Sequence, residues 1–390
     1  MRTPVRLAIV ATHPVQYQAP WFARLAADPA LDLTVYYGHR PTPEEHAAAG
    51  FGVPFEWDRP LLDGYRAAFL RNAARRPSLT RFFGVDTPEI GTRLSRATCD
   101  AVLVMGWHFL GAWQAFQACR RAGLPVLVRS DSHLRTRRSA LTRGLKRMLY
   151  PPFIGRLDAC LAVGTWSREY FEHYGASPER VFIVPHSVDP ALWESHAPQP
   201  RDGLRRRFLL SEDAFVVLFA GKLSGAKRPL DPIAATAMAV RQGVRVELLV
   251  VGDGPLRQEC EAAAMASGAP VRFAGFLNQS EMQQAYAVSN ALVVPSAETW
   301  GLVVNEAMTC GLPCVVSNAV GSWPDLVQPD ATGDVFPLGN VEALAARILA
   351  WARDPEPVRV MGRRARERIA AFSPQGAAAG LNAALAKVLA

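Results

Sequence analysis

The sequence predicts an α/β protein built from two doubly wound parallel sheets, one after the other along the chain. Short apolar runs of strand length alternate with helical stretches over the first 184 residues. A polar, turn-rich stretch follows at 185–200, and the alternation restarts near Phe215. Strands that alternate with helices run parallel and are covered on both faces, so each half is expected to form its own sheet. A chain of 390 residues is long enough for two such domains.

The apolar runs place the strands of each half. The N-terminal strands are predicted at 5–12, 31–37, 101–105, 125–129, 159–163 and 181–184, with helices at 19–27, 111–122, 138–149 and 166–174. The C-terminal strands are predicted at 214–220, 246–251, 271–274, 291–294 and 314–317. We therefore expect an N-terminal domain at 1–188, a linker at 189–210, a C-terminal domain at 211–370 and a final segment at 371–390.

The composition is that of a globular protein with a full core. Hydrophobic residues make up 49% of the chain and charged residues 20%. The first apolar run has only strand length and no run approaches the roughly 18 residues of a membrane span, so neither a signal peptide nor a spanning helix is expected. The six cysteines are scattered, and Cys310 and Cys314 have no nearby histidine, which argues against zinc. A reduced, cytoplasmic protein is expected.

The net charge of +8 belongs entirely to the N-terminal half. Residues 1–190 hold 24 Lys and Arg against 16 Asp and Glu, whereas the remainder holds 19 of each. Within 129–147, basic residues far outnumber a single acid, Asp131. Such a stretch is usually a solvated face, but basic charge confined to one domain also indicates an anionic partner. Nucleic acid is not expected, because no recognition helix, zinc finger or aromatic RNA-binding motif accompanies the charge.

Two carboxylates flank a predicted helix start in the C-terminal half. Glu298 follows the strand at 291–294, and Glu306 lies about one turn inside the next helix. The helix start between them has free N–H groups that suit a phosphate, whereas carboxylates suit pairs of sugar hydroxyls. Acids near a helix N-terminus are also common for structural reasons. The two carboxylates around a helix start favour a nucleotide-sugar site when they are taken together with a second segment.

That second segment carries two lysines after the strand at 214–220. Lys222 and Lys227 are five residues apart across a small-residue turn that leads into a helix, so both can converge on one diphosphate. At about 4 Å and an effective dielectric near 20, each gains on the order of 4 kcal/mol of Coulomb energy before desolvation. Most turn lysines are merely solvated. Gly252-Asp-Gly254 repeats the strand-then-glycine pattern, which indicates a parallel sheet with its loops at the strand C-termini.

Two other kinds of chemistry are disfavoured. A dinucleotide-dependent oxidoreductase carries glycines directly after its first strand, and Ala11-Thr-His-Pro-Val-Gln16 contains none. No D-x-D pair occurs in the chain, so no obvious residues hold a divalent metal ion on a nucleotide diphosphate. Lysines are therefore expected to neutralise the diphosphate charge, with no metal ion and no cofactor.

Five segments of the C-terminal half resemble the donor domain of glycosyltransferase family 4. They are Phe219-Ala-Gly-Lys-Leu with Lys227, Val251-Gly-Asp-Gly-Pro-Leu256, Phe273-Ala-Gly-Phe-Leu277, Glu298 through Glu306, and Ala307-Met-Thr-Cys-Gly-Leu-Pro-Cys-Val-Val316. Their order and spacing argue against chance agreement. The resemblance implies a retaining enzyme of the GT-B fold, with two Rossmann-like doubly wound domains facing a central cleft. It also implies that the last helical stretch, 375–390, returns to the first domain.

The resemblance assigns roles to the donor side. It implies that Glu306 holds the ribose diol, that Glu298 holds the sugar hydroxyls, and that the two lysines hold the diphosphate. Lys222 stands where many relatives have Arg, which keeps the charge but loses bidentate contact. The catalytic work is then electrostatic stabilisation of the leaving diphosphate, and no covalent nucleophile is identified. The implied donor-binding set is Gly221, Lys222, Lys227, Phe276, Leu277, Glu298, Gly301, Leu302 and Glu306.

The N-terminal half resembles the family only in general terms. His108 follows the strand at 101–105, where a family histidine commonly contacts the transferred sugar, so it joins Lys222, Lys227 and Glu298 as a candidate catalytic residue. The acceptor candidates are His133, on the loop after the next strand, and His13, Gln16 and Tyr17 on the first loop, which lacks the family's usual glycine pair. Gly321-Ser-Trp-Pro-Asp325 also departs from the usual Gly-Gly and Glu.

These observations predict a retaining, metal-independent hexosyltransferase that moves a sugar from a nucleotide sugar to a carbohydrate or lipid-linked acceptor, as in bacterial surface polysaccharide or glycolipid assembly. The segment at 135–149 mixes basic and apolar residues, which favours docking to an anionic membrane at its inner face; a soluble acceptor and a solvated helix remain open. The alternatives are a nucleotide-sugar epimerase or hydrolase of the same fold, and a non-catalytic binding module. The mixed set is Arg135, Arg137, Arg138, Leu141, Arg143, Leu145, Lys146, Arg147, Met148 and Leu149.

Overall fold

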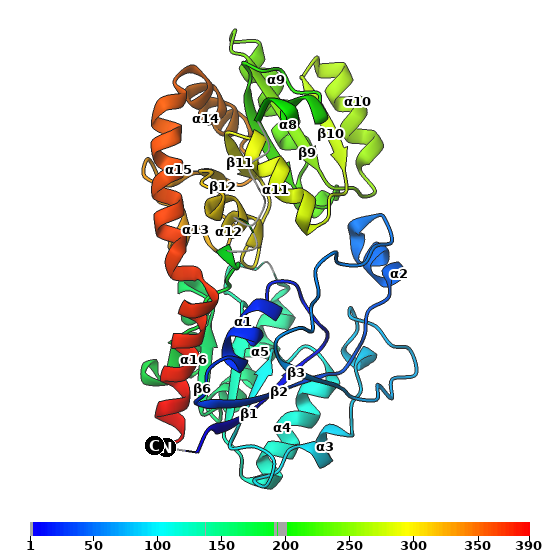
Figure 1. Ribbon diagram of the computed structural model, residues 1–390, viewed down its shortest axis with the longest axis vertical. Coiled ribbons are helices and arrows are strands. Elements are labelled where there is room, and N and C mark those ends of the chain that lie inside the picture. Colours follow the sequence, from blue (N-terminus) through cyan, green and yellow to red (C-terminus); the bar gives the residue numbers. More distant parts are fainter. Residues whose placement is uncertain (1–2, 137, 191–192, 194–200) are drawn as a thin grey trace. The chain divides into compact units, whose positions relative to one another are not determined.

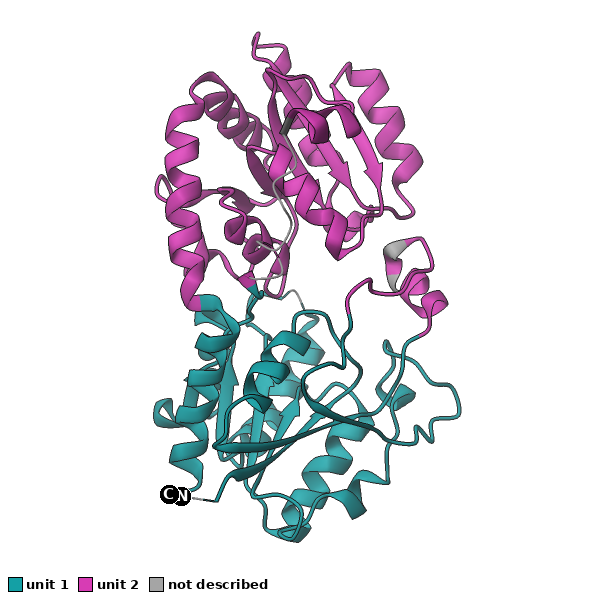
Figure 2. Ribbon diagram, in the orientation of Figure 1, with its two compact units in different colours: residues 1–41, 60–189, 372–390 teal, residues 42–59, 190–371 magenta. Residues whose placement is uncertain are grey.

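A computed structural model describes residues 3–136, 138–190, 193 and 201–390. It divides into two compact units, each made of more than one stretch of chain (Figure 2). Unit 1 comprises residues 1–41, 60–189 and 372–390, and unit 2 comprises 42–59 and 190–371. The final helix, predicted from the family resemblance to return to the first domain, groups with unit 1 in this division.

Unit 1 is built on a seven-stranded parallel sheet in the order β3-β2-β1-β4-β5-β6-β7 (Figure 1). Continuous apolar runs form its inner strands because helices cover both faces. The order reverses between β1 and β4, so their carboxyl ends open at a switch point. The strands are β1 Val5–Ala11, β2 Leu31–Tyr37, β3 Arg66–Phe69, β4 Ala101–Met105, β5 Val126–Ser130, β6 Ala159–Ala162 and β7 Val181–Ile183.

The two faces of this sheet carry separate cores. Leu7 and Ile9 on one face of β1 pack with Phe22 of α1 and Leu381 of α16, whereas the alternate residues face the core that contains Phe116. A Cβ on Gly380 would meet the Ile183 carbonyl oxygen at 2.0 Å, so only glycine lets α16 pack this closely on β7. The helices are α1 Ala19–Ala26, α3 Ile90–Arg93, α4 Leu110–Ala122, α5 Ala140–Ile154, α6 Thr165–His173 and α16 Pro374–Val388.

Unit 2 is built on a six-stranded parallel sheet in the order β10-β9-β8-β11-β12-β13. Its switch point lies between β8 and β11, which pair directly through Ala291 and Val217. The strands are β8 Phe215–Ala220, β9 Val246–Val251, β10 Val271–Gly275, β11 Ala291–Val294, β12 Cys314–Ser317 and β13 Gly333–Phe336. The helices are α8 Arg201–Arg207, α9 Leu230–Val240, α10 Arg257–Ser267, α11 Gln279–Val288, α12 Leu302–Thr309, α13 Trp323–Leu326, α14 Val341–Arg353 and α15 Pro355–Ile369.

Residues 42–59 leave the chain of unit 1 between β2 and β3 and join unit 2. They include α2 Pro43–His46, whose Thr42 cap and Glu45 form a capping box. The Phe55 ring lies 4.4 Å from the Phe276 ring after β10, and Asn278 Nδ2 donates to the Glu56 carbonyl at 2.7 Å. The sequence analysis placed this segment in the N-terminal domain, and it placed α8 within a linker.

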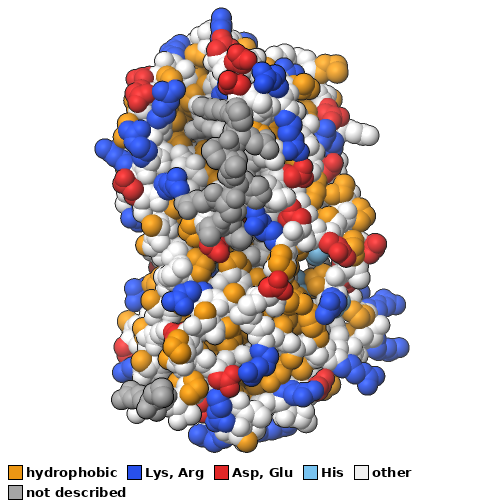
Figure 3. All heavy atoms as spheres, in the orientation of Figure 1, with side chains coloured by type: hydrophobic (Ala, Val, Ile, Leu, Met, Phe, Trp, Pro, Cys, Tyr) orange, Lys and Arg blue, Asp and Glu red, His pale blue; other side chains and the backbone are white. Residues whose placement is uncertain are grey.

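No helix in the described part of the chain is both long and apolar enough to cross a membrane. The six cysteines are all free thiols, and five of them are buried. The face shown in Figure 3 carries Lys and Arg side chains interspersed with Asp and Glu, with apolar atoms between them.

Candidate functional site

In unit 2, an ion pair joins the Lys227 ammonium group to both carboxylate oxygens of Glu298. Lys227 Nζ lies 2.6 Å from Oε1 and 2.7 Å from Oε2 of Glu298, and Ser296 Oγ donates to the same carboxylate at 2.5 Å. The two side chains are 33% and 15% exposed. Lys227 follows β8 and Glu298 follows β11, the two strands that meet at the switch point. A cation and a carboxylate thus face each other where an open α/β sheet places its ligand.

The loop that carries Glu298 is held by backbone contacts with the loop after β12. Glu298 N donates to the Ala319 carbonyl at 3.1 Å, and Gly321 N donates to the Glu298 carbonyl at 3.0 Å. A Cβ on Gly321 would lie 1.8 Å from the Thr299 carbonyl oxygen. Gly301, which caps α12, has a φ of 93°, a left-handed conformation that favours glycine. The departure from the usual family pattern at Gly321-Ser322 therefore keeps the one glycine that this close approach requires.

Glu306 lies on α12 and points its carboxylate at a buried tyrosine. Tyr286 Oη on α11 donates to Glu306 Oε2 at 2.7 Å. Burial raises the pKa of Glu306 to about 7, with the Tyr286 hydrogen bond acting in the opposite direction. Burial and the neighbouring Glu306 charge also raise the pKa of Tyr286. Near neutral pH the Glu306 carboxyl therefore exists in both protonation states.

Lys222 lies in the loop after β8, five residues before Lys227. Burial lowers its pKa, the charge of Lys227 lowers it further, and Glu298 opposes both. The loops after β8 and β9 touch, because Gly221 N donates to the Val251 carbonyl at 2.9 Å and a Cβ on Gly252 would meet the Gly221 carbonyl oxygen at 2.0 Å. Gly252 has a φ of 129°. Glycines at both loops thus bring the backbone beside Lys222.

The remaining donor candidates occupy two places in unit 2. Gly301 and Leu302 begin α12 directly after Glu298, as the sequence analysis placed them. Phe276 and Leu277 follow β10, where Phe276 packs on Phe55 of the inserted segment. The structure thus brings the lysines, Glu298 and the α12 start to the switch point, while Phe276 lies two strands away. Their assigned roles stay predictions.

His108 follows β4 in unit 1, beside the switch point of that sheet. Its ring is stacked at 5.8 Å on Trp107, and it lines a small cavity of about 70 Å³ with Thr12 and Gly38. Burial lowers the pKa of His108, Asp131 raises it, and Lys146 and Arg138 lower it. The imidazole is therefore neutral at pH 7 and able to accept or donate a hydrogen bond.

The acceptor candidates contact different neighbours. The Tyr17 ring stands edge-on to His186 at 4.9 Å, and burial raises the pKa of Tyr17 to about 12. His13 Nδ1 lies 2.9 Å from Thr12 Oγ1, and Gln16 is partly buried on the same loop. His133 is 8% exposed, its ring lies 5.3 Å from the Trp166 ring, and its Nδ1 accepts from Arg135 N. The His133 ring thus packs into unit 1.

The structure adds polar residues in unit 1 that the sequence analysis did not select. Arg129 at the end of β5 is buried, and its guanidinium lies beside His186, which follows β7. Asp131 faces that histidine. One available signal was the arginine that ends an otherwise apolar strand, since an arginine is almost never buried without partners. The pairing partner 57 residues away could not be found from sequence alone.

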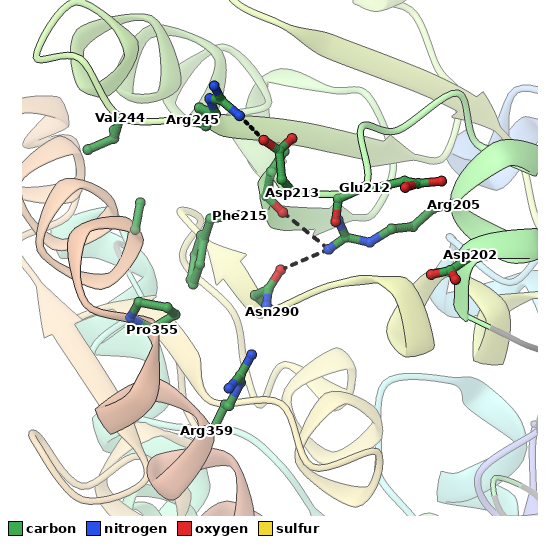
Figure 4. A pocket seen from close by; sticks show the side chains of 12 residues that line it. Asp202, Arg205, Glu212, Asp213, Phe215, Val244, Arg245, Asn290, Pro355 and Arg359 are labelled. Atoms are coloured by element: carbon green, nitrogen blue, oxygen red, sulfur yellow. Dashed lines mark hydrogen bonds and ion pairs between the residues drawn. The ribbon is translucent and has the colours of Figure 1, made fainter.

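A polar pocket of unit 2 contains none of the predicted residues (Figure 4). It has a volume of about 420 Å³ and lies at the amino end of β8, away from the strand C-termini. Arg205, which points into it, donates to the carbonyls of Ser211, Glu212 and Ala214 and so ties the chain together before β8. We assign this pocket a structural role.

No cluster of three or more His, Cys, Asp or Glu residues able to hold a metal ion occurs among the described residues.

Comparison with known proteins assigns the chain to a family. The family described as Glycosyl transferases group 1 matches residues 200–368, the stretch that carries both lysines and both carboxylates. D-inositol 3-phosphate glycosyltransferase 1 of Catenulispora acidiphila is 31% identical over 297 residues, which are 71% of this chain and 69% of that protein. The chain belongs to the group 1 glycosyl transferases.

Other relatives of this group 1 glycosyltransferase match shorter stretches. 2-deoxystreptamine glucosyltransferase of Streptomyces kanamyceticus is 33% identical over 200 residues, half of this chain and 51% of that protein. Sulfoquinovosyl transferase of Arabidopsis thaliana is 40% identical over 121 residues, 30% of this chain and 23% of that protein. Apart from the Catenulispora protein, these relatives are matched over less than two thirds of their length.

Solved structures confirm the fold class of the group 1 glycosyltransferase, with two Rossmann-like parallel sheets of the GT-B type. Sucrose-phosphate synthase from Thermosynechococcus elongatus aligns with a TM-score of 0.74 at 21% identity, over 97% of each chain. Anabaena HepE in complex with UDP and glucose aligns with a TM-score of 0.72 at 17% identity, over 98% of this chain and 99% of that chain. At such identities the likeness concerns the fold alone.

Proposed function

We propose that this glycosyltransferase moves a sugar, with retention, from a nucleoside-diphosphate sugar to a polar acceptor without a metal ion. The observation that carries the proposal is the pairing of Lys227 with Glu298 at the switch point of unit 2. The start of α12, the helix that contains Glu306, follows Glu298 in the chain. Cation, helix N-terminus and carboxylates are the groups that a sugar diphosphate requires. Lys227 and Lys222 take the diphosphate charge in place of a metal ion.

We expect donor binding to change the hydrogen-bond partners of Lys227 and Glu298. Lys227 is paired with Glu298, so a diphosphate that binds takes over the ammonium group and releases the carboxylate to the sugar hydroxyls. Glu306 accepts hydrogen bonds from the ribose diol. As the bond to the anomeric carbon breaks, negative charge grows on the diphosphate and the fixed lysines stabilise it. His108 is the proposed contact to the transferred sugar.

Three similar proteins guide the choice of substrates to test. HepE, which shares the fold, has been solved with UDP-glucose bound, so UDP-glucose is the first donor to test. The Catenulispora and Streptomyces relatives are named for an inositol phosphate and for 2-deoxystreptamine, both highly polar rings.

The proposed function is tested by product analysis with UDP-glucose, a panel of polar ring acceptors and excess EDTA. We expect a glycoside of unchanged anomeric configuration by NMR and no loss of rate on chelation. An epimerised nucleotide sugar, free sugar as the sole product, or binding without turnover would establish one of the alternative functions. Activity lost with EDTA and restored by magnesium would disprove metal independence.

Glu306 should make donor binding depend on pH. A folded-state pKa near 7, above the ordinary 4.5, means that this carboxyl lowers the free energy of unfolding as pH rises from about 4.5 to about 7. The ionised form is the better acceptor for a ribose diol, so the Kd of UDP-glucose should rise about tenfold from pH 8 to pH 6. Calorimetric titration measures this change.

Glu306→Gln is the matched control for this pH dependence. It keeps the shape and one acceptor oxygen but cannot ionise, so its Kd should be weaker at pH 8 and flat across the same range. A wild-type Kd that stays constant from pH 8 to pH 6 would contradict the assignment of Glu306 to the ribose.

We further propose that unit 1 docks on an anionic membrane through α5, which places the enzyme at the inner face of the membrane beside a lipid-linked acceptor. Leu141, Leu145 and Met148 on α5 are 84%, 51% and 65% exposed, an arrangement that water disfavours. Arg138, Arg143 and Arg147 are exposed around them; Arg137 lies outside the described residues. Exposed apolar side chains beside cations are typical of interfacial helices. A soluble acceptor and a solvated helix are the alternatives.

Co-sedimentation with vesicles tests this docking. We expect binding to vesicles that contain phosphatidylserine, little binding to neutral vesicles, and loss at 1 M salt, where the Debye length falls to about 3 Å. Changing Arg138, Arg143 and Arg147 together to Ser should abolish binding. The control removes three exposed arginines from unit 2, Arg353, Arg363 and Arg364, and should bind like wild type. Equal partitioning onto both lipids, or none at low salt, rules out the membrane proposal.

A further inference from the structure

A chain of three polar side chains lies at the carboxyl end of the unit 1 sheet, and the mechanism above leaves it without a role. Its base is Arg129, which is 5% exposed. The guanidinium donates from Nε to the Val184 carbonyl at 3.1 Å and from Nη2 to the Pro185 carbonyl at 3.0 Å. Nη2 also lies 3.2 Å from His186 Nδ1. The cation is thus fixed by backbone on one side and by an imidazole on the other.

This contact determines the tautomer of His186. A guanidinium only donates hydrogen bonds, so Nδ1 must accept and the ring proton must sit on Nε2. Nε2 lies 3.9 Å from Asp131 Oδ2. Burial, reinforced by the Arg129 charge, lowers the pKa of His186 to about 4, so the ring is neutral at pH 7. It therefore presents a fixed N–H to the carboxylate.

Asp131 is the outer end of the chain. Its side chain is 39% exposed, whereas that of His186 is 5% exposed. Burial works against its ionisation, but His186 and Arg129 outweigh that effect and hold the pKa of Asp131 below its usual value. Its charge also reaches His108, whose pKa it raises, and Tyr17. His186 and Arg129 thus favour the ionised form of Asp131, whose side chain stays partly exposed. Two predicted site residues, His108 and Tyr17, are near enough to sense its charge.

We propose that Asp131 is the acceptor-binding carboxylate of this glycosyltransferase and that it takes a hydroxyl or ammonium group of a polar ring. His186 and Arg129 are positioning residues that hold its orientation and charge. The inference rests on the proposed function and names the chemistry of the acceptor: a ring that offers hydrogen-bond donors. A carboxylate grips such groups by charge-assisted hydrogen bonds, which are roughly twice as strong as neutral ones. No proton transfer to Asp131 is needed, because its role is orientation.

The test separates acceptor binding from donor chemistry. Saturation-transfer NMR measures the binding of myo-inositol and glucosamine to wild type and to Asp131→Asn, and UDP-glucose hydrolysis is measured for both. We expect both rings to bind wild type, Asp131→Asn to weaken glucosamine binding at least tenfold, and hydrolysis to fall by much less than ring binding does. For any ring that wild type glycosylates, kcat/KM for the acceptor should fall at least about tenfold in the variant.

Two variants of His186 test the positioning role. His186→Gln retains an acceptor for Arg129 and an N–H for Asp131, so glucosamine should bind within about threefold of wild type. His186→Phe fills the space without either group and should weaken binding about as much as Asp131→Asn does. A purely structural role would instead lower the melting temperature and reduce hydrolysis and binding together.

The possible failures are distinguishable. If wild type turns over no nucleotide sugar, the proposed function fails, and ring binding still decides the Asp131 site. If neither ring binds wild type, or if Asp131→Asn binds glucosamine within twofold, the Asp131 site is disproved whatever the donor does.

Discussion

Lys227→Ala should lower turnover of the nucleotide sugar at least about 100-fold. The ammonium group contacts both oxygens of Glu298 and is the proposed partner of the leaving diphosphate. Removing one contact of this kind to a developing charge costs roughly 100- to 1,000-fold in rate. The effect should appear in kcat, because the charge on the diphosphate grows in the transition state. Steady-state kinetics with UDP-glucose measure it.

The control for Lys227 is Lys387→Ala, on the exposed side of α16 in unit 1. It removes the same charge and should leave kcat unchanged. The Lys227–Glu298 pair is partly exposed, so its loss should change the melting temperature only slightly. Glu306→Ala, in contrast, should mainly weaken nucleotide binding. Wild-type turnover in both the Lys227 and the Glu306 variant would remove the donor-site assignment.

Gly321→Ala should both destabilise unit 2 and reduce donor turnover. The added Cβ would lie 1.8 Å from the Thr299 carbonyl oxygen and 3.1 Å from Trp300 N, so the loop after β12 must move away from the Glu298 loop. That movement stretches the bond from Gly321 N to the Glu298 carbonyl. Overpacking typically costs about 1–3 kcal/mol. Thermal unfolding and UDP-glucose kinetics together measure the two effects.

Gly225→Ala provides the comparison for this substitution. Gly225 lies in the lysine loop of the same unit, and a Cβ there would meet no atom within 4 Å. Its melting temperature and kcat should match wild type. If Gly321→Ala behaves in the same way, the close approach of the two loops does not position Glu298.

The central strands of both sheets were predictable from sequence, but the edge strands β3 and β13 were missed. A central strand of a parallel sheet is covered on both faces, which forces a continuous apolar run such as Leu248 to Val251. β3 and β13 lie at the sheet edges, with one neighbour each. Arg66 in β3 and Asp334 in β13 interrupt the apolar pattern, so these strands look like loops in the sequence. The insertion at 42–59 was missed because its partners are more than 200 residues away.

The sequence by itself determined which residues carry charge after each strand, because strand, glycine turn and helix start are local patterns. It pointed to Lys222, Lys227, Glu298 and Glu306, whose catalytic roles remain to be tested. Only the tertiary structure decided which of these side chains contact one another. The strand order places β8 beside β11, so Lys227 reaches Glu298 across 71 residues, and Tyr286 and His186 become partners of Glu306 and Arg129. Such pairs depend on how distant segments pack, and burial sets their pKa values, so local patterns cannot reveal them.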